Sequence, residues 1–289
     1  MKKLNKTLFV PLFVAILAIS LPTICLGAEP TVNLGTTASF AILAGQTITN
    51  TGSSVINGST GGDVGLYPGS SFVDQATMTI SGAVHINDTL AITAKTDLVA
   101  AYDDAAGRTN VTRIESELGG KTLIPGVYDS ADGEFQITGT LTLDAQGDPN
   151  GVFIFKTATT LITASASDIN IIGGARFCRI FWKVGSSATL GSNSNFVGHI
   201  FALQSISVNT GATIQGQLLA RNGSVTLDSN TITNGLCATI EELNTTINGG
   251  KLPKTGTPFY NILLIGMLSL SIGVIGFVNK KKVWEKLYK

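Results

Sequence analysis

Histidines and paired acidic residues are scarce in this sequence, and their scarcity bears on catalysis. Only His85 and His199 occur among the 289 residues, and neither stands in a recognisable nucleophile–base pattern. Asp63 follows two glycines, a setting in which a carboxylate stabilises a turn more often than it serves a hydrolase or a calcium ion. We therefore expect no enzymatic activity, no bound metal and no cofactor. Each histidine is expected at the surface or at the interface with a helix.

The first 27 residues are typical of a secretory signal. A basic start precedes an apolar run over residues 8–21, and a small-x-small triplet at 25–27 predicts cleavage before Ala28. A lipoprotein attached through Cys25 is the alternative, which the bulky Ile24 disfavours. The sequence therefore predicts export.

The other end of the chain combines a short motif, an apolar run over residues 259–278 and a basic tail over 279–289. The run is long enough to span a bilayer, and the lysines of the tail would keep that end in the cytoplasm. The motif is Leu252-Pro253-Lys254-Thr255-Gly256. This order resembles the sortase sorting signal of Gram-positive bacteria. The resemblance implies that sortase cleaves after Thr255 and joins it covalently to the peptidoglycan of the cell wall; a plain membrane anchor is the alternative.

The part between these two ends is acidic and contains two cysteines. Residues 28–255 include 11 basic and 18 acidic residues, a net charge of −7, which argues against nucleic acid and anionic lipid as partners. In an exported chain, Cys178 and Cys237 are expected to form a disulfide rather than a zinc site. By chain entropy, a closed loop of about 60 residues would stabilise the fold by about 4 kcal/mol.

A short repeat is the main structural signal in this domain, which we place at residues 28–237. Strand-length apolar runs alternate with glycine and asparagine turns, which predicts a mostly β chain. Between Ser187 and Thr233 one pattern recurs at offsets of 18 and 19 residues. Its copies are Ser187-Ala188-Thr189-Leu190, Ser205-Ile206-Ser207-Val208 and Ser224-Val225-Thr226-Leu227. A fixed short period predicts a β-solenoid.

Alternation along each strand assigns its residues to the inside or the outside of the coil. In the repeated strand the apolar residues should point inward, and the Ser and Thr residues should stack outside as a ladder of hydroxyls. A second strand should bury Phe196, Ile214 and Ile232 and expose Asn195, Thr213, Thr231 and Thr233. A third should bury Ile200, Ala202, Leu218 and Ala220. The outward residues of the third strand, Phe201 and Leu219, are too apolar for water and need a cover.

One segment has helical rather than strand periodicity. Apolar residues recur every three or four positions from Ile86 to Ala105, Asn87 or Asp88 can cap the start, and Gly107 can end it. We expect a helix over about 88–107 that covers Phe201 and Leu219. Three strands per coil indicate a triangular cross-section.

Several motifs resemble the bacterial and fungal ice-binding-like (antifreeze) protein family. They are Ser39–Gly45, Gly61–Gly69, Leu123–Tyr128, Gly151–Phe155, Ile180–Gly191, Val208–Thr213 and Leu218–Gly223. They occur in the family's order over about residues 32–236. The resemblance implies a discontinuous right-handed β-helix of triangular section with one long α-helix packed alongside. Lys183 and His199 depart from the family pattern, since amides are expected at these positions.

The resemblance also implies ice binding through a flat, threonine-rich face that no helix covers. Strands about 4.8 Å apart and alternate residues about 6.7 Å apart form a rigid grid of hydroxyls that can hold water in an ice-like array. Thr210-Gly211-Ala212-Thr213 matches the family's Thr-(Ala/Gly)-x-(Thr/Asn) motif, whereas Ser229-Asn230-Thr231-Ile232 does not. The candidate ice- or ligand-binding residues are Ser187, Thr189, Ser205, Ser207, Thr210, Thr213, Ser224, Thr226, Thr231 and Thr233.

Two other functions fit the same pattern. Half of the ladder is serine, which lacks the methyl group of threonine, and a hydroxyl ladder can be merely a solvated surface. The alternatives are a cell-surface adhesin or a carbohydrate- or peptidoglycan-binding module without ice activity, and a purely structural surface protein. The linker at 238–251 reaches at most about 50 Å when extended, which favours a short-range role at the cell wall and counts against both ice and host adhesion.

Overall fold

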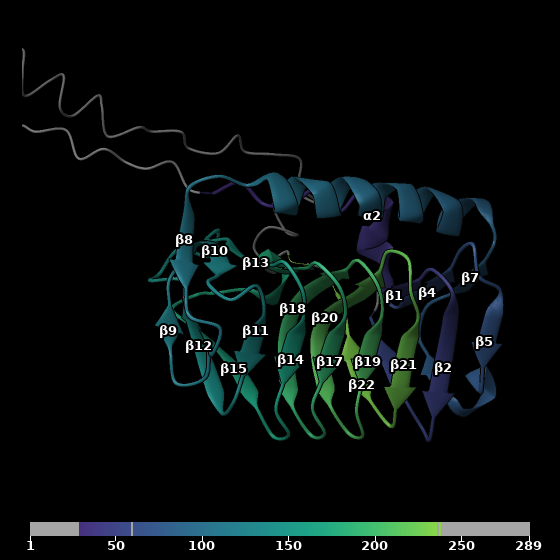
Figure 1. The fold of residues 1–289 in the computed structure, drawn as a ribbon. Coiled ribbons are helices and arrows are strands. Elements are labelled where there is room, and N and C mark those ends of the chain that lie inside the picture. The colour runs from purple at the N-terminus through teal and green to yellow at the C-terminus, as the bar shows by residue number, and fades with distance from the viewer. Residues whose placement is uncertain (1–28, 59, 236, 238–289) are drawn as a thin grey trace, which may run out of the picture. The chain divides into compact units, whose positions relative to one another are not determined.

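The computed structural model describes residues 29–58, 60–235 and 237, which belong to one compact unit ending at Cys237 (Figure 1). The expected signal segment, linker, sortase motif, apolar run and basic tail all lie outside the described residues. Within the described part of the chain, no helix is both long and apolar enough to cross a membrane.

The described chain is mostly short β-strands with a single long helix. Its elements are η2 (Gly35–Ser39), β1 (Phe40–Ala44), β2 (Thr47–Thr51), β3 (Val55–Asn57), β4 (Asp63–Leu66), β5 (Ser71–Val73), η3 (Gln75–Thr77), β6 (Thr79–Ile80), β7 (Val84–Ile86), α2 (Thr89–Gly107), β8 (Val111–Ile114), β9 (Thr122–Leu123), β10 (Gly126–Ser130), β11 (Phe135–Ile137), β12 (Thr140–Asp144), β13 (Phe153–Thr157), β14 (Leu161–Thr163), β15 (Asp168–Ile172), η4 (Phe177–Arg179), β16 (Ile180–Val184), β17 (Ala188–Leu190), β18 (Asn195–Ala202), β19 (Ile206–Val208), β20 (Thr213–Ala220), β21 (Val225–Asp228) and β22 (Thr231–Thr233).

The strands pair in parallel, coil upon coil, with the period expected from the repeat. Ala188 pairs with Ile206, and Ile206 pairs with Val225, so the offsets of 18 and 19 residues are the rise from one coil to the next. The apolar residues of these strands are at most 2 % exposed, as the alternation predicts. The mostly β, parallel architecture with one helix is therefore confirmed.

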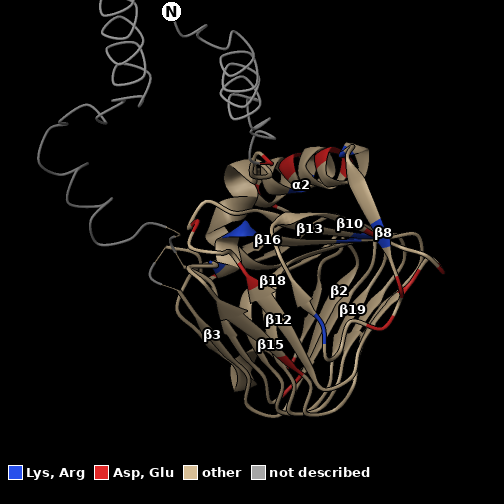
Figure 2. Cartoon of the chain, turned by 90° about the vertical axis from the view of Figure 1, so that its left-hand side faces the viewer, with Lys and Arg blue, Asp and Glu red and all other residues tan. Residues whose placement is uncertain are grey.

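The coils present three sides, which we name by their strands. The ladder face is the outer side of the seven-stranded sheet β11-β14-β17-β19-β21-β2-β5. The second face contains β12, β15, the first halves of β18 and β20, β22 and β3. The covered face contains β13, β16, the second halves of β18 and β20, and β1. Figure 2 shows α2 lying across one side of the coils.

The order of the coils in space differs from their order in the sequence. β1 and β2 pair with β20 and β21, so the first strands of the domain extend the stack beyond its last coils. The chain then continues outward through β4 and β7, and α2 returns along the stack to β8 at its other end (Figure 1). The strands therefore do not stack in the order in which they follow along the chain, and α2 runs from one end of the stack to the other.

The helix begins and ends where its sequence signals predict. The carboxylate of Asp88 accepts the backbone N–H of Ala91 at 2.8 Å, and this bond lowers the pKa of Asp88. Phe201 and Leu219 are fully buried in a cluster with the apolar side of α2. Ile86 and Leu90 were expected in the packed stripe but are each 37 % exposed; Ile86 belongs to β7, before the helix begins.

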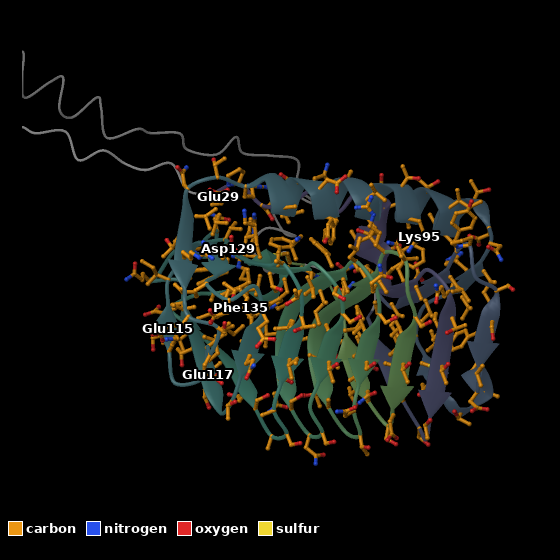
Figure 3. The ribbon with its side chains drawn as sticks, viewed as in Figure 1. Glu29, Lys95, Glu115, Glu117, Asp129 and Phe135 are labelled. Carbon is orange, nitrogen blue, oxygen red and sulfur yellow. A yellow bond between two sulfur atoms is a disulfide. The ribbon has the colours of Figure 1, made fainter. Side chains whose placement is uncertain are left out.

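A buried lysine fastens the helix to the coils. Lys95 is 8 % exposed, and its Nζ donates to the carbonyl oxygens of Ala220 at 2.7 Å and Arg221 at 2.5 Å. Figure 3 shows Lys95 between α2 and the strands, whereas Phe135 lies inside the coils. Burial lowers the pKa of Lys95 to about 7.

A disulfide closes the described domain. Cys178, in η4, is bonded to Cys237, and their Cα atoms are 5.6 Å apart. The carbonyl oxygen of Cys237 also accepts a hydrogen bond from Arg176 Nη1 at 3.2 Å. The end of the last coil is thereby tied to the segment that leads into β16.

Candidate functional site

The centre of the ladder face is an unbroken row of hydroxyls. The register aligns Thr189 with Ser207, Ser207 with Thr226, and Thr226 with Thr49. Figure 1 shows β14, β17, β19, β21, β2 and β5 side by side and pointing the same way. The row ends in two exposed apolar residues, Ile162 on β14 at 40 % and Val73 on β5 at 43 %. Sequence reasoning missed Thr49, because β2 joins the row from the other end of the chain.

A second row of hydroxyls lies at the edge of the ladder face and is half-buried. Ser187 Oγ accepts the backbone N–H of Ser205 at 3.3 Å, and Ser205 Oγ accepts that of Ser224 at 3.1 Å. Thr47 Oγ1 donates to Ser224 Oγ at 2.8 Å. These serines stack as predicted, but each coil uses the hydroxyl of its neighbour. The row therefore holds the coils in register and offers water fewer free hydrogen-bonding positions than the central row.

A corner joins the ladder face to the second face in each coil, and its geometry explains the Thr-Gly-Ala-Thr segment. One corner residue per coil has a positive φ. These residues are Gly139, Ala166, Asn193, Gly211, Ser229 and Gly52. Glycine best fits such a backbone, and the next residue, Ala212, is fully buried. The glycine and alanine of the segment therefore fit the corner, where other coils have Ala166, Asn193 or Ser229 at the positive φ.

The register also corrects the comparison of this segment with the following coil. Thr213 pairs with Thr231, so the equivalent of Thr210–Thr213 is Asp228–Thr231, one residue earlier than expected from the sequence. That segment also lacks the motif, since aspartate stands in its first position. The two corners touch, because Thr210 Oγ1 donates to Asp228 Oδ2 at 2.5 Å.

The structure divides the ten predicted residues between two faces. Ser187, Thr189, Ser205, Ser207, Ser224 and Thr226 lie on the ladder face, and Thr210 lies at the corner. Thr213, Thr231 and Thr233 lie on the second face, in β20 and β22. Thr213 Oγ1 donates there to Asn195 Oδ1 at 2.6 Å. No single flat surface can therefore contact all ten residues.

The two histidines have separate structural settings. His85 Nδ1 lies 2.7 Å from Asp88 Oδ2 at the start of α2. His199 is 2 % exposed between the rings of Phe177 and Phe181, and among the described residues neither of its ring nitrogens has a hydrogen-bond partner. A surface position is thus wrong for His199. Across the described ranges, no three His, Cys, Asp or Glu side chains gather in a way that could hold a metal ion.

Burial of His199 should make the domain sensitive to acid. Burial lowers the pKa of His199 from 6.5 to about 4, so between these values the unfolded chain binds a proton that the folded chain does not. Stability should therefore fall as the pH drops from 6.5 to 4, by about 3 kcal/mol from this residue. Urea unfolding measured across this pH range should show a flatter profile for His199→Gln. Equal slopes in His199→Gln and in the wild-type protein would contradict the assignment.

Comparisons with known proteins agree with this geometry. The sequence pattern of the ice-binding-like family matches residues 42–233. The chain is 43 % identical over 203 residues to the ice-binding protein of Nostoc sp. (strain HG1), covering 70 % of this chain and 73 % of that protein. It is 38 % identical over 221 residues to that of Flavobacterium frigoris (strain PS1), covering 70 % and 76 %. The crystal structure of an ice-binding protein from an Antarctic biological consortium superposes with a TM-score of 0.69 at 40 % identity, covering 72 % of this chain and 93 % of that one. The chain belongs to the ice-binding-like family.

Proposed function

We propose that this protein binds ice through the ladder face. The observation that carries the proposal is the row Thr49, Thr226, Ser207 and Thr189, which crosses four adjacent parallel strands without a break in register. Parallel strands set such hydroxyls about 4.8 Å apart, and the β-branched threonines have few rotamers to lose when they order water. The relatives named as ice-binding proteins support this ligand.

The second face fits an ice surface less well. β15 and β18 pair there only at Asp168 and Asn195. Beyond this pair the two strands separate and the surface is recessed at Val197, which is 7 % exposed. Its outward side chains include the flexible Gln215 as well as a carboxylate, whereas the central row of the ladder face, from Thr189 to Thr49, carries only short hydroxyl side chains. A rigid crystal plane requires a level, rigid surface, so we assign the ice contact to the ladder face.

We infer further that the parallel coils form the right-handed β-helix of triangular section that the family resemblance implies. Three strand segments per coil and the positive φ at one corner of successive coils support the triangular section. In this scaffold the ladder face is one complete side, free of the helix.

The activity can be tested on residues 28–255. The superposed part of this chain covers 93 % of the ice-binding protein solved from an Antarctic biological consortium, which supports testing the domain as a separate unit. At micromolar concentration it should inhibit ice recrystallisation or show thermal hysteresis. Absence of both effects at high micromolar concentration would refute ice binding.

We also propose that the exported protein is anchored to the cell wall of a Gram-positive bacterium through Thr255. The proposal rests on the order of motif, apolar run and basic tail. Digestion of isolated walls with a muramidase should release a protein whose last residue, found by mass spectrometry, is Thr255 linked to wall fragments. Release by detergent alone would indicate a plain membrane anchor instead.

A further inference from the structure

The second face contains a shallow depression that ice binding does not use. Its volume is about 370 Å³, and it extends over β15, β18, β20 and β22. One row of its rim carries Asp168, Asn195, Thr213 and Thr231, and a second row carries Gln215 and Thr233. Four neighbouring strands span about 14 Å, so the depression is elongated along the stack of coils.

The depression exists because two strands diverge. After the pair of Asp168 with Asn195, β18 turns away from β15 to join β16. The carbonyl oxygen of Val197 then accepts the indole N–H of Trp182 at 3.0 Å, and Gly198 turns the strand with a φ of 114°. The gap is thus fixed by buried contacts. Apolar residues lie beneath the gap: Val197 is 7 % exposed, whereas Phe196 and Ile214 are 2 % exposed and belong to the core inside the coils.

The rim offers polar groups that the protein leaves unused. Among the described residues, the side chains of Asp168, Gln215, Thr231 and Thr233 have no hydrogen-bond partner in the protein. Asn195 accepts from Thr213 through Oδ1, and its amide NH₂ remains free to donate. Together the rim provides a carboxylate and hydroxyls that accept, and amides and hydroxyls that donate.

We propose that this depression binds a neutral glycan chain. A sugar presents rows of hydroxyls that both donate and accept, together with an apolar C–H face, and the rim and the apolar residues beneath the gap match these two features. The volume lies within the usual range for ligand sites, and the elongated shape suits a chain running along the coils. The carboxylate of Asp168, which has no cationic partner within the described ranges, disfavours anionic sugars. The site lies on a different face from the ice contact and does not depend on it.

The experiment measures binding of cellopentaose and chitopentaose to residues 28–255 by NMR titration, with polygalacturonate oligomers as the anionic probe. At least one neutral probe should bind, with shifts at Asn195, Gln215 and Thr233. The variants Gln215→Ala and Asp168→Ala should each weaken that binding at least tenfold. Neither variant should alter the inhibition of ice recrystallisation.

A matched change on the other face separates the two sites. Ser207→Tyr should leave the affinity for the neutral probe within twofold of wild type. The proposal is overturned if no neutral probe binds at millimolar concentration, if the anionic probe binds more tightly, or if the rim variants bind as wild type does. It is also overturned if the rim variants lose ice activity, since the second face would then belong to the ice contact.

Discussion

Ser207→Tyr should abolish ice activity while the domain stays folded. Ser207 lies at the centre of the hydroxyl row, between Thr189 and Thr226, on the outer side of β19. Its neighbours along the strand, Ile206 and Val208, carry the packing, since both are at most 2 % exposed. A tyrosine ring would therefore stand out from the face and hold a flat crystal away from Thr189 and Thr226 on either side. We expect at least a tenfold loss in ice recrystallisation inhibition with an unchanged circular dichroism melt.

Thr233→Tyr is the matched control for this change. Thr233 is an exposed residue of β22 on the second face, so the same added ring should leave ice activity intact. The reverse outcome, with Thr233→Tyr inactive and Ser207→Tyr active, would assign the ice contact to the second face. Loss in both variants would show that the contact extends around the corner.

Gly216→Ala should destabilise the domain by about 4 kcal/mol or more, enough to unfold much of it. Gly216 has a φ of 147°, and a Cβ added there would lie 2.0 Å from the carbonyl oxygen of Gly198 in the neighbouring coil. The clash is with backbone, which cannot swing aside as a side chain can. β18 and β20 are paired at every position from Asn195 to Ala202, so relief would require breaking this ladder.

Gly107→Ala is the control for this second change. Gly107 ends α2, and an added Cβ would meet no other atom within 4 Å. Its free energy of unfolding should change by no more than about 1 kcal/mol, with stabilisation the expected sign. Urea unfolding followed by circular dichroism compares the two variants. Equal midpoints would show that the coils can shift at the Gly198–Gly216 contact.

Local sequence patterns correctly predicted which side chains point into the coils and which strands the helix covers. Alternation placed Leu190, Val208 and Leu227 inside, and the helical period placed α2 over Phe201 and Leu219. These predictions succeed because burial of apolar side chains is decided by the neighbours along one strand or one helix turn. The pairing of Cys178 with Cys237 followed from their being the only two cysteines left after the expected leader.

The composition of each face could not be predicted in the same way. The repeat assigns Thr189 and Thr213 to different strands and alternation points both outward, but neither pattern states that the corner between these strands prevents one flat surface from containing both residues. The corner depends on single residues with positive φ, such as Asn193 and Ser229, which carry no strong sequence signal. Thr49 was missed because its strand reaches the row only through pairing across the whole domain.

By itself, then, the sequence determined the coil period, the inward residues, the helix and the membership of the family, because each depends on residues close together in the chain. The tertiary structure alone decided which hydroxyls share a level surface, where the first strands join the stack, and where two strands part to leave a depression. These features depend on the register between strands far apart in the chain, and register is set by the packing of the whole domain.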